Sequence, residues 1–502
     1  MKSLEYSINP LVTQIEKEPK DFTRKDIIDF IIRNDIRIVN FRYVASDGRL
    51  KTMNIPVTDR HYLDTFLSYG ERVDGSSLFP YIGTGSSDLY VIPRFCTAYA
   101  DPFAVTPTLG LLCSYFTKDG LPFEMAPEYT LHKAHKLFTD KTGYRFEAMG
   151  ELEFYVTDKD TNQFNTASQK GYHESAPFSK FETFRTHAIQ LMAKTGGMVK
   201  YGHSEVGNFS LDGKIYEQNE IEFLVNPVEQ AADQLVMAKW ILRTLAWQYG
   251  LDITFAPKIT SGKAGSGLHF HTRIMKGDRS VMLEGGMLSD AARTVIAGYM
   301  KCATALTAFG NTIPTSYFRL VPNQEAPTNV CWGDHNRSVL VRVPLGWSGH
   351  GDMILQVNPL ECGSSENPGS QNAIDKQTVE FRSADGSADI YYVLAGLVVA
   401  ARTGFEMPDA LQTAARTYVD RNIHDYQDSL NTLEQLPASC HESALVLAQQ
   451  RKLFEAHNVF TPELIDGTIN ALNAYADKDI RREIQENPGL MMALVRKYYY
   501  CG

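Results

Sequence analysis

Four short apolar segments of the sequence carry charged side chains two residues apart. The segments contain Glu151-Leu152-Glu153, Glu220-Ile221-Glu222, His269-Phe270-His271 and Glu380-Phe381-Arg382. Residues two apart in a β-strand lie on the same face, so each segment predicts a strand with one polar face. Apolar residues at helical spacing occupy 231–249, 291–309, 391–403 and much of 442–500. We therefore expect a sheet with one face backed by helices and the other face available for chemistry.

The chain is large enough for several domains and has the composition of a folded protein. Its 502 residues correspond to about three domain-sized units, and 43% of them are apolar. Lys and Arg number 49 against 59 Asp and Glu, which gives a net charge of −10. A chain this acidic is a poor general binder of nucleic acid or of an anionic membrane, so we expect neither as a partner.

The cysteines and the apolar segments bear on the compartment. Seven cysteines are scattered along the chain, and no two form a C-x-x-C pair. This pattern argues against a disulfide framework and a thiolate zinc site, and it suits a reducing cytosol. The N-terminus leads into no apolar signal region, and the apolar run at 391–401 is shorter than the roughly 20 residues that span a bilayer. We expect a soluble, cytoplasmic protein.

The sequence predicts a small α+β domain over residues 1–105 and a larger domain over 106–502. The first part contains a helix at 22–34, strands at 36–44 and 50–57 around the turn Ser46-Asp47-Gly48, and a strand at 89–92. Residues 74–87 are rich in Gly and Ser and predict no regular element. In the larger domain, residues 345–378 form a Gly-, Ser- and Asn-rich insertion with one short strand at 353–357.

Paired acids and histidines indicate a metal site. Glu151 and Glu153 would lie about 6–7 Å apart on one strand face, where two carboxylates repel each other unless a cation is near. His269 and His271 share a strand face in the same way. Carboxylates with an imidazole suit Mg²⁺ or Mn²⁺ better than structural zinc. The plain alternatives are solvated glutamates on an edge strand and histidines satisfied by hydrogen bonds.

Arginines suggest an anionic substrate. Arg337 and Arg342 frame an apolar run, and Arg319 and Arg382 flank the same region of the sequence. Arginine clamps and divalent metals serve phosphoryl transfer, because charge spreads over the transferring oxygens. No P-loop or Rossmann glycine motif occurs in the sequence. Surface salt bridges remain the alternative for each arginine.

The order of these motifs resembles that of the glutamine synthetase family from about residue 22 onward. The similar segments are Asp74-Gly75-Ser76-Ser77, Gly150 to Phe154, Gln218-Asn219-Glu220, Gly265 to His271, Arg319 to Pro327, Asn336-Arg337-Ser338 and Val379 to Arg382. The resemblance implies an N-terminal β-grasp domain and a large catalytic domain with an antiparallel sheet backed by helices. It implies ATP-dependent ligation of L-glutamate and ammonia through γ-glutamyl phosphate.

The resemblance also implies roles for individual residues. One divalent metal would be held by Glu153, Glu205 and Glu220, and the other by Glu151, His269 and Glu380. ATP would meet His271, Arg337 and Arg342. Glutamate would meet Gly265, His269, Arg319 and Arg382. Ammonium would meet Asp74, Ser77, Tyr172 and Glu205, with Asp74 as the base, and Glu325 would close the site. The family's active sites form between subunits, which implies a homododecamer.

Some positions depart from the family pattern. Glu205 lies 15 residues before Glu220, so residues 207–216 look like an insertion. In Asn422-Ile423-His424-Asp425, His424 stands where some bacterial members carry an adenylylated tyrosine. We therefore expect no control by adenylylation.

Three other functions stay open on the sequence. A γ-glutamyl ligase could use an amine such as putrescine or methylamine instead of ammonia. A catalytically inactive relative would have lost metal ligands or arginines, and none is lost here. An unrelated metal hydrolase could use His269 and His271 with nearby acids, but the arginines and the motif order argue against it.

Overall fold

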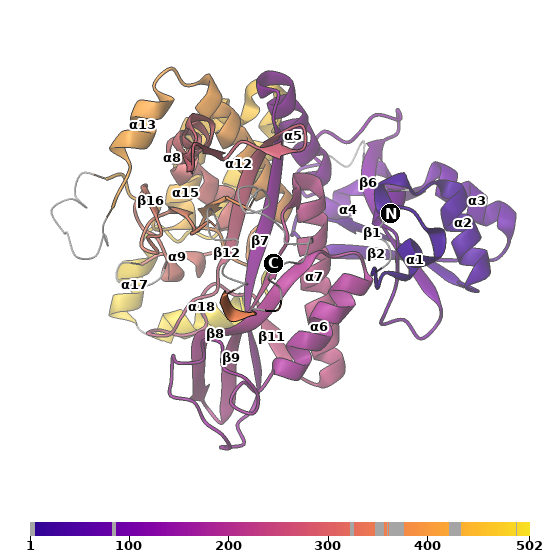
Figure 1. Cartoon of the computed structure of the whole chain (residues 1–502), viewed down its shortest axis with the longest axis horizontal. Helices are drawn as coiled ribbons and strands as arrows, with labels where there is room; N and C mark the ends of the chain where they lie inside the picture. The colour runs from indigo at the N-terminus through magenta and orange to yellow at the C-terminus, as the bar shows by residue number, and fades with distance from the viewer. Residues whose placement is uncertain are drawn as a thin grey trace.

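The computed structural model describes residues 6–82, 87–321, 326–346, 356–358, 360, 376–420, 433–487 and 489–502. A smaller sheet formed by the N-terminal part of the chain lies at one end of the molecule (Figure 1). A larger sheet and most of the helices form the rest. Arg94 in the N-terminal part joins the two units through Asp233, with both of its terminal nitrogens 2.8 Å from the carboxylate.

The N-terminal sheet has the strand order β2-β1-β6-β4-β3, with β5 paired to β6. Strands β1 and β6 are parallel, and the other pairs are antiparallel. Helix α2 begins with a capping box in which Thr23 and Asp26 bond to each other's backbone. The bounds are α1 (Pro10–Ile15), η1 (Pro19–Asp21), α2 (Arg24–Arg33), β1 (Ile38–Val44), β2 (Leu50–Pro56), α3 (Arg60–Tyr69), β3 (Glu71–Asp74), α4 (Gly75–Leu78), β4 (Asp88–Pro93), η3 (Phe95–Thr97), β5 (Tyr99–Ala100) and β6 (Thr108–Thr117).

These bounds confirm the predicted helix, hairpin and strand of this region and correct one prediction. Residues 74–87 were expected to hold no regular element, but β3 ends at Asp74 and α4 follows directly. The Asp74 carboxylate accepts the backbone N–H of Ser76, which caps this single turn. The domain boundary at residue 105 stays a prediction, although β6 lies beyond it and pairs with β1.

The larger sheet has the strand order β16-β17-β18-β12-β7-β9-β8. The pairs are antiparallel except β16 with β17. Strands β10 and β11 pair with β7, and β13 pairs with β12. The bounds are β7 (Arg145–Lys159), β8 (Val199–Leu211), β9 (Lys214–Phe223), β10 (Asn226–Pro227), β11 (Asp252–Thr254), β12 (Leu268–Lys276), β13 (Arg279–Ser280), β14 (Leu283–Glu284), β15 (Met287–Leu288), β16 (Trp332–Asp334), β17 (Val341–Val343) and β18 (Val379–Phe381).

Long helices cover one face of this sheet, as the apolar periodicity predicted. Helix α12 is buried along nearly its whole length. No single helix among the described residues is long and apolar enough to cross a bilayer; α12 and α13 reach that length and composition only as a pair bent by 111°. The bounds are α5 (Pro127–Thr142), α6 (Glu182–Lys194), α7 (Val228–Tyr249), α8 (Asp290–Gly310), α9 (Ser316–Arg319), α12 (Ile390–Glu406), α13 (Ala410–Arg416), α15 (Cys440–Glu455), η6 (Ala456–Asn458), α16 (Pro462–Asn473), α17 (Ile480–Glu486) and α18 (Gly489–Lys497).

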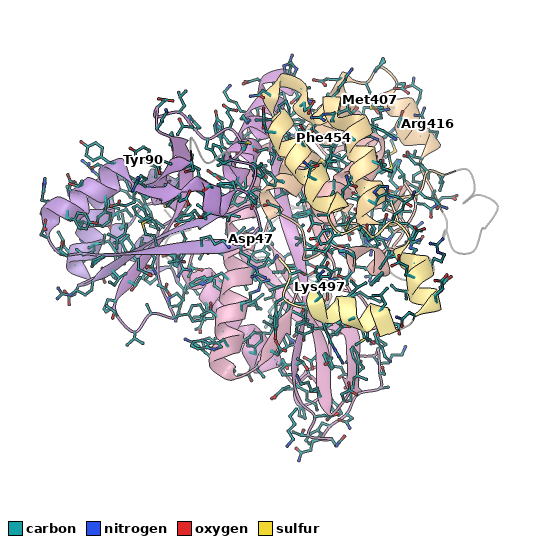
Figure 2. All side chains as sticks on the ribbon, turned by 180° about the vertical axis from the view of Figure 1, so that it is seen from behind. Asp47, Tyr90, Met407, Arg416, Phe454 and Lys497 are labelled. Carbon is teal, nitrogen blue, oxygen red and sulfur yellow. The ribbon has the colours of Figure 1, made fainter. Side chains whose placement is uncertain are left out.

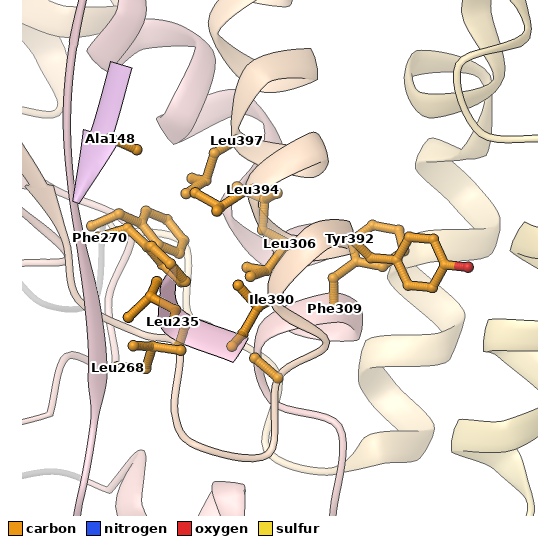
Figure 3. Close-up of a cluster of buried hydrophobic side chains, with 14 of the residues drawn as sticks. Ala148, Leu235, Leu268, Phe270, Leu306, Phe309, Ile390, Tyr392, Leu394 and Leu397 are labelled. Atoms are coloured by element: carbon orange, nitrogen blue, oxygen red, sulfur yellow. The ribbon is translucent and has the colours of Figure 1, made fainter. Parts of the chain in front are cut away.

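The core lies between the sheet and these helices. Figure 3 shows Phe270 of β12 directed toward Leu235 of α7 and Leu394 of α12. Phe270 alternates with His269 and His271, so the same strand supplies the core on one face and polar side chains on the other. The expected sheet with one helix-backed face is confirmed.

Strands β8 and β9 form a long hairpin that explains the unusual spacing of Glu205 and Glu220. Asp212 and Gly213 form its two-residue turn, and both have positive φ, as a type I′ turn requires. Residues 207–216, which looked like an insertion, make the outer part of this hairpin. Near its base the register shifts between Ser204 and Asn208, so three residues of β8 face Gln218 alone.

From behind, C-terminal helices cover the larger unit, including those that carry Phe454 and Lys497 (Figure 2). After α18, the chain packs against both units. Arg49 of the β1–β2 turn donates to the Tyr500 carbonyl at 2.5 Å, and Arg243 of α7 donates to the Cys501 carbonyl at 2.7 Å. Most of the predicted 345–378 insertion lies outside the described residues. Within its expected strand, Gln356 and Val357 are helical instead.

Candidate functional site

The polar face of the larger sheet forms a cleft of about 1610 Å³. Its walls come from β7, β8, β9, β12, β17 and β18, with the loops around residues 169–172 and 262–265. The strand register determines which charged groups meet in it. Antiparallel pairing places residues from neighbouring strands directly opposite each other, so polar residues at alternate positions form rows across the sheet.

Three such rows cross the cleft. In the first, Glu380 lies between His271 and Arg342. In the second, Glu151 lies between His269 and Glu222. In the third, Glu220 lies between Glu153 and His203. The rows therefore bring together side chains from segments far apart in the sequence, all on one face.

The first candidate metal centre consists of Glu151, His271 and Glu380. One ligand atom from each lies within 4.8 Å of the others. Glu151 Oε1 lies 2.7 Å from His271 Nε2, and Glu151 Oε2 lies 3.1 Å from His269 Nδ1. Burial alone would raise the pKa of Glu151, but the two imidazoles hold it well below its usual range. Glu151 therefore stays ionised inside the cleft.

Arginines flank this centre. Glu380 receives Arg342 Nη1 at 3.1 Å and Arg382 Nε at 2.9 Å. Arg342 Nε is buried and has no hydrogen-bond partner among the described groups. Arg337 is exposed at the cleft, and its carbonyl accepts a bond from Arg382. These guanidinium groups can meet phosphate or carboxylate oxygens.

His269 and Arg319 form a neighbouring pair. Arg319 Nη2 lies 3.2 Å from His269 Nε2, and the same guanidinium donates to the carbonyls of Arg382 and Ser383. Because Arg319 has only donors, Nε2 of His269 accepts and Nδ1 carries the proton. His269 Nδ1 lies 3.1 Å from Glu151 Oε2 and 3.5 Å from Glu380 Oε1, so His269 adjoins both carboxylates of the first candidate centre.

A second candidate metal centre consists of His203, Glu220 and Glu222, again with ligand atoms within 4.8 Å of one another. Burial raises the pKa of Glu220 well above its usual range, and the nearby glutamates add to this effect. Those glutamates are Glu151, Glu153, Glu205 and Glu222. Oxygen and imidazole donors around such a crowded carboxylate fit a hard divalent cation, which would remove the repulsion.

Glu153 and Glu205 lie beside this second centre with other contacts. Glu153 Oε2 accepts the backbone N–H of Gly267 at 2.7 Å and the side-chain amide of Gln218 at 3.0 Å. Glu205 lies in the shifted part of β8, and its Oε2 accepts the N–H of Val206 at 2.8 Å. Both carboxylates line the cleft.

Most of the predicted site residues therefore meet in one place. The cleft is lined by Glu151, Glu153, Tyr172, Glu205, Glu220, Gly265, His269, His271, Arg319, Arg337, Arg342, Glu380 and Arg382. Asp74 and Ser77 do not line it; they lie on β3 and α4 in the N-terminal unit, where Ser77 donates to Asp74 at 2.8 Å. The serine hydrogen bonds lower the pKa of Asp74 and keep it ionised. Glu325 and His424 lie outside the described residues.

His203 and Glu222 line the cleft but were not predicted from the sequence as site residues. Glu222 could have been predicted from the sequence, because it lies two positions from Glu220 on the same predicted strand face. His203 could be placed only by the pairing of β8 with β9, which brings it opposite Glu220. Its strand was not among those predicted.

Comparison with known protein families gives a match in each of the two units. Residues 35–118 match the beta-Grasp domain of glutamine synthetase, and residues 124–357 match its catalytic domain. The chain belongs to the glutamine synthetase family. The predicted α+β fold, with an N-terminal β-grasp domain and a large catalytic domain, is thereby confirmed. The catalytic match ends before β18, yet β18 pairs with β12 and brings Glu380 into the cleft.

Relatives match over most of the chain. The glutamine synthetase of Thermotoga maritima is 28% identical over 447 residues, covering 86% of this chain and 92% of its own. That of Pyrococcus furiosus is 29% identical over 427 residues, covering 84% and 87%. Among solved structures, Plasmodium falciparum glutamine synthetase has a TM-score of 0.73 at 18% identity, covering 91% of this chain and 96% of that chain. GmaS without ligand has a TM-score of 0.70 at 18% identity, covering 90% and 96%.

Proposed function

We propose that this protein ligates L-glutamate and ammonia to L-glutamine with ATP. The observation that carries the proposal is the convergence of two carboxylate–histidine centres and several arginines on one cleft of a chain in this family. The glutamate side-chain oxygen attacks the γ-phosphorus of ATP, and ADP leaves. The ammonia nitrogen then attacks the acyl carbon of γ-glutamyl phosphate, and phosphate leaves.

The cleft residues suit the first step. Glu151, Glu380 and a histidine would hold one Mg²⁺ or Mn²⁺ ion, and Glu220 with its neighbours would hold the other. The bound cations would neutralise charge on the phosphate oxygens during transfer. Arg337 and Arg342 would orient the phosphates. Arg342 has a buried nitrogen to donate, which supports this role.

The glutamate site would lie beside Gly265. Arg319 and Arg382 line the cleft there, and Arg319 is held by backbone carbonyls that fix its direction. Residues 262–265 form a loop anchored by Gln218, whose side chain donates to the Gly265 carbonyl at 2.9 Å. We assign these groups to the binding of the amino acid and its carboxylates.

The ammonium site needs groups from two subunits in this proposal. Tyr172 and Glu205 line the cleft of their own chain, whereas Asp74 and Ser77 lie away from it on the N-terminal unit. A neighbouring subunit in a homododecamer would supply Asp74, whose carboxylate binds ammonium and takes its proton. Glu325 would exclude water from the acyl phosphate.

Phosphate release from ATP tests the reaction. Purified protein with Mg²⁺ and glutamate receives ammonium, methylamine or putrescine, and mass spectrometry identifies the product. Glutamine formed with ammonium, and lost in Arg337→Ala and Glu325→Ala, supports the proposal. Release only with an organic amine would assign the chain to the rival γ-glutamyl ligases. No release with any acceptor would overturn both.

Mixing two inactive variants tests the shared site. Asp74→Asn and Arg342→Ala would each remove one subunit's contribution. If active sites form between subunits, dissociating and reassociating a mixture of the two restores part of the activity. Sites contained within single chains would leave the mixture inactive. Mass photometry of the same samples gives the subunit number.

A further inference from the structure

We propose that Gln169 is a positioning residue for the cleft, whose side-chain amide fixes the 262–265 loop and thereby sets the affinity for L-glutamate. The effect on glutamate rests on the proposed function. The contact between Gln169 and the loop belongs to the free protein, so it can be tested without any substrate. Gln169 lies between β7 and α6, distant from the loop in the sequence, and both line the cleft.

The side-chain amide of Gln169 joins two parts of the chain. Its Oε1 accepts the backbone N–H of Ala264 at 2.7 Å, and its Nε2 donates to the carbonyl of Asn208 at 3.3 Å. A backbone N–H can only donate and a carbonyl can only accept, so these two partners determine the orientation of the amide. One end of the side chain therefore holds the loop, and the other end holds β8.

The backbone of Gln169 has an uncommon conformation that β8 maintains. Its φ is +63°, in the left-handed region that residues with a Cβ seldom adopt. The carbonyl of Asn208 also accepts the backbone N–H of Gln169 at 3.0 Å, and Asn208 Oδ1 accepts the N–H of Lys170 at 2.9 Å. Asn208 lies where the regular pairing of β8 with β9 resumes, on the outer strand of the sheet. These bonds direct the side chain of Gln169 to the loop.

The loop is held by other side chains in a different way. Three of them donate to its carbonyls: Lys258 to Lys263, Tyr155 to Ala264 and Gln218 to Gly265. Gln169 instead accepts an N–H. Removal of its oxygen leaves the Ala264 N–H without this partner, so the peptide unit between Lys263 and Ala264 becomes freer to rotate.

The position of the loop matters for the proposed glutamate site, because Gly265 lies directly against Arg319. A Cβ placed on Gly265 would come within 3.0 Å of Arg319 Cγ. The N–H of Gly265 has no acceptor among the residues that the structure describes, so it is available to a carboxylate that also meets the Arg319 guanidinium. A shift of the loop moves one of these donors relative to the other and weakens the binding of the carboxylate.

Amide hydrogen exchange of the full chain tests the contact without substrate. Gln169→Met keeps the length of the side chain but removes its acceptor and its donor, whereas Gln169→Glu keeps an acceptor. Gln163→Met is the matched control, because Gln163 lies in the same segment, is exposed and does not line the cleft. We expect exchange in a peptide spanning residues 258–266 to be about three- to tenfold faster in Gln169→Met alone. Unchanged protection of this peptide in Gln169→Met overturns the inference.

Kinetics of Gln169→Lys separate the contact from the charge of the cleft. Lysine can still donate to the Asn208 carbonyl, but it has no acceptor for Ala264 and adds a positive charge near an anionic substrate. Electrostatic attraction alone would lower the KM for glutamate, whereas loss of the contact raises it. With ATP, Mg²⁺ and ammonium in excess, we expect the KM to rise by about three- to tenfold and kcat to change by less than about twofold.

Two results distinguish failure of this inference from failure of the proposed function. A lower or unchanged KM for glutamate in Gln169→Lys, in a protein that makes glutamine, overturns the role of Gln169 in substrate affinity. Absence of phosphate release from the unaltered protein with every amine contradicts the proposed function instead. The hydrogen exchange of Gln169→Met still decides whether the side chain fixes the loop.

Discussion

Oε1 of Glu151 lies 2.7 Å from Nε2 of His271, across the antiparallel pair of β7 and β12. The opposite nitrogen of the ring, Nδ1, lies 2.9 Å from the hydroxyl of Thr378. The imidazole is therefore fixed at both ends, and its contact with Glu151 does not depend on a flexible loop. Glu380 completes the triad from the next strand. The position of this centre is thus determined by strand register.

Glu151→Gln tests the importance of this centre. The substituted amide would keep the shape but lose the charge that balances two imidazoles and a cation, so we expect phosphate release to fall by about 100-fold or more. We expect removal of divalent metal with EDTA to have the same effect on the unaltered protein, and Mg²⁺ or Mn²⁺ to restore phosphate release. Glu217→Gln is the matched control on β9, since Glu217 bonds to Ser179 and Lys180 away from the cleft. Equal activity of the two variants would contradict the assignment.

Much of this arrangement could be predicted from the sequence. Alternation within single strands was enough to group Glu151 with Glu153 and His269 with His271, because the period of a strand is two residues. The helix-backed face followed from apolar spacing in α7, α8 and α12. These are local properties, and the structure confirms them.

The composition of each candidate metal centre could not be predicted in the same way. It depends on which residue of one strand lies opposite which residue of the next, and a register shift changes that partner. The shift between Ser204 and Asn208 leaves His203 opposite Glu220 and moves Glu205 aside. Nothing local in the sequence marks that shift. The position of Asp74 away from the cleft likewise depends on how the two units pack.

Arg342→Lys tests the proposed contact of Arg342 with the phosphates of ATP. Arg342 donates to Glu380 and has a further buried nitrogen, whereas lysine offers one charged nitrogen and no planar fork. Loss of one charged hydrogen bond is worth about 1.5–3 kcal/mol, so we expect the KM for ATP to rise by about tenfold or more. Arg279 is exposed on β13, and we expect Arg279→Lys to leave the KM for ATP unchanged. An unchanged KM in Arg342→Lys would remove Arg342 from the nucleotide site.

Gly207→Ala tests the coupling of the hairpin to the proposed glutamate site. A Cβ at Gly207 would overlap the Tyr155 hydroxyl and Oε1 of Gln218. Gln218 bonds to Glu153 and to Gly265, so its displacement disturbs both the acidic centre and the loop. We expect the KM for glutamate to rise and the free energy of unfolding to fall by about 1–3 kcal/mol.

A substitution at the hairpin turn separates this effect from a general disturbance. Asn tolerates the positive φ of position 213, and no atom lies within 4 Å of a Cβ placed there. Gly213→Asn therefore adds a side chain without a steric clash. It should therefore leave the KM for glutamate unchanged. Similar KM values for Gly207→Ala, Gly213→Asn and the unaltered protein would show that the outer hairpin does not influence the site.

Glu128 gives the stability of the fold a pH dependence. It lies in the first turn of α5, where its Oε1 accepts the N–H of Tyr115 at 2.9 Å. Burial raises the pKa of Glu128 from 4.5 to about 7. The folded protein therefore retains a proton that the unfolded chain loses as the pH rises above 4.5. The stabilisation is fully present below that unfolded-state pKa and is lost as the pH rises through about 7.

Glu128→Gln removes this titration while keeping an oxygen for Tyr115. The pKa shift of Glu128 corresponds to a free energy of about 3 kcal/mol at most. Between about pH 4.5 and 7.5 the free energy of unfolding of the unaltered protein should therefore fall by up to that amount relative to Glu128→Gln. Thermal unfolding at a series of pH values measures the difference. Glu463→Gln is the matched control, because Glu463 follows a first-turn proline in α16 as Glu128 does in α5, but is exposed. If all three proteins show the same dependence of unfolding temperature on pH, Glu128 does not titrate in this range. The charge of Arg94 would then lower the pKa of Glu128 by more than burial raises it.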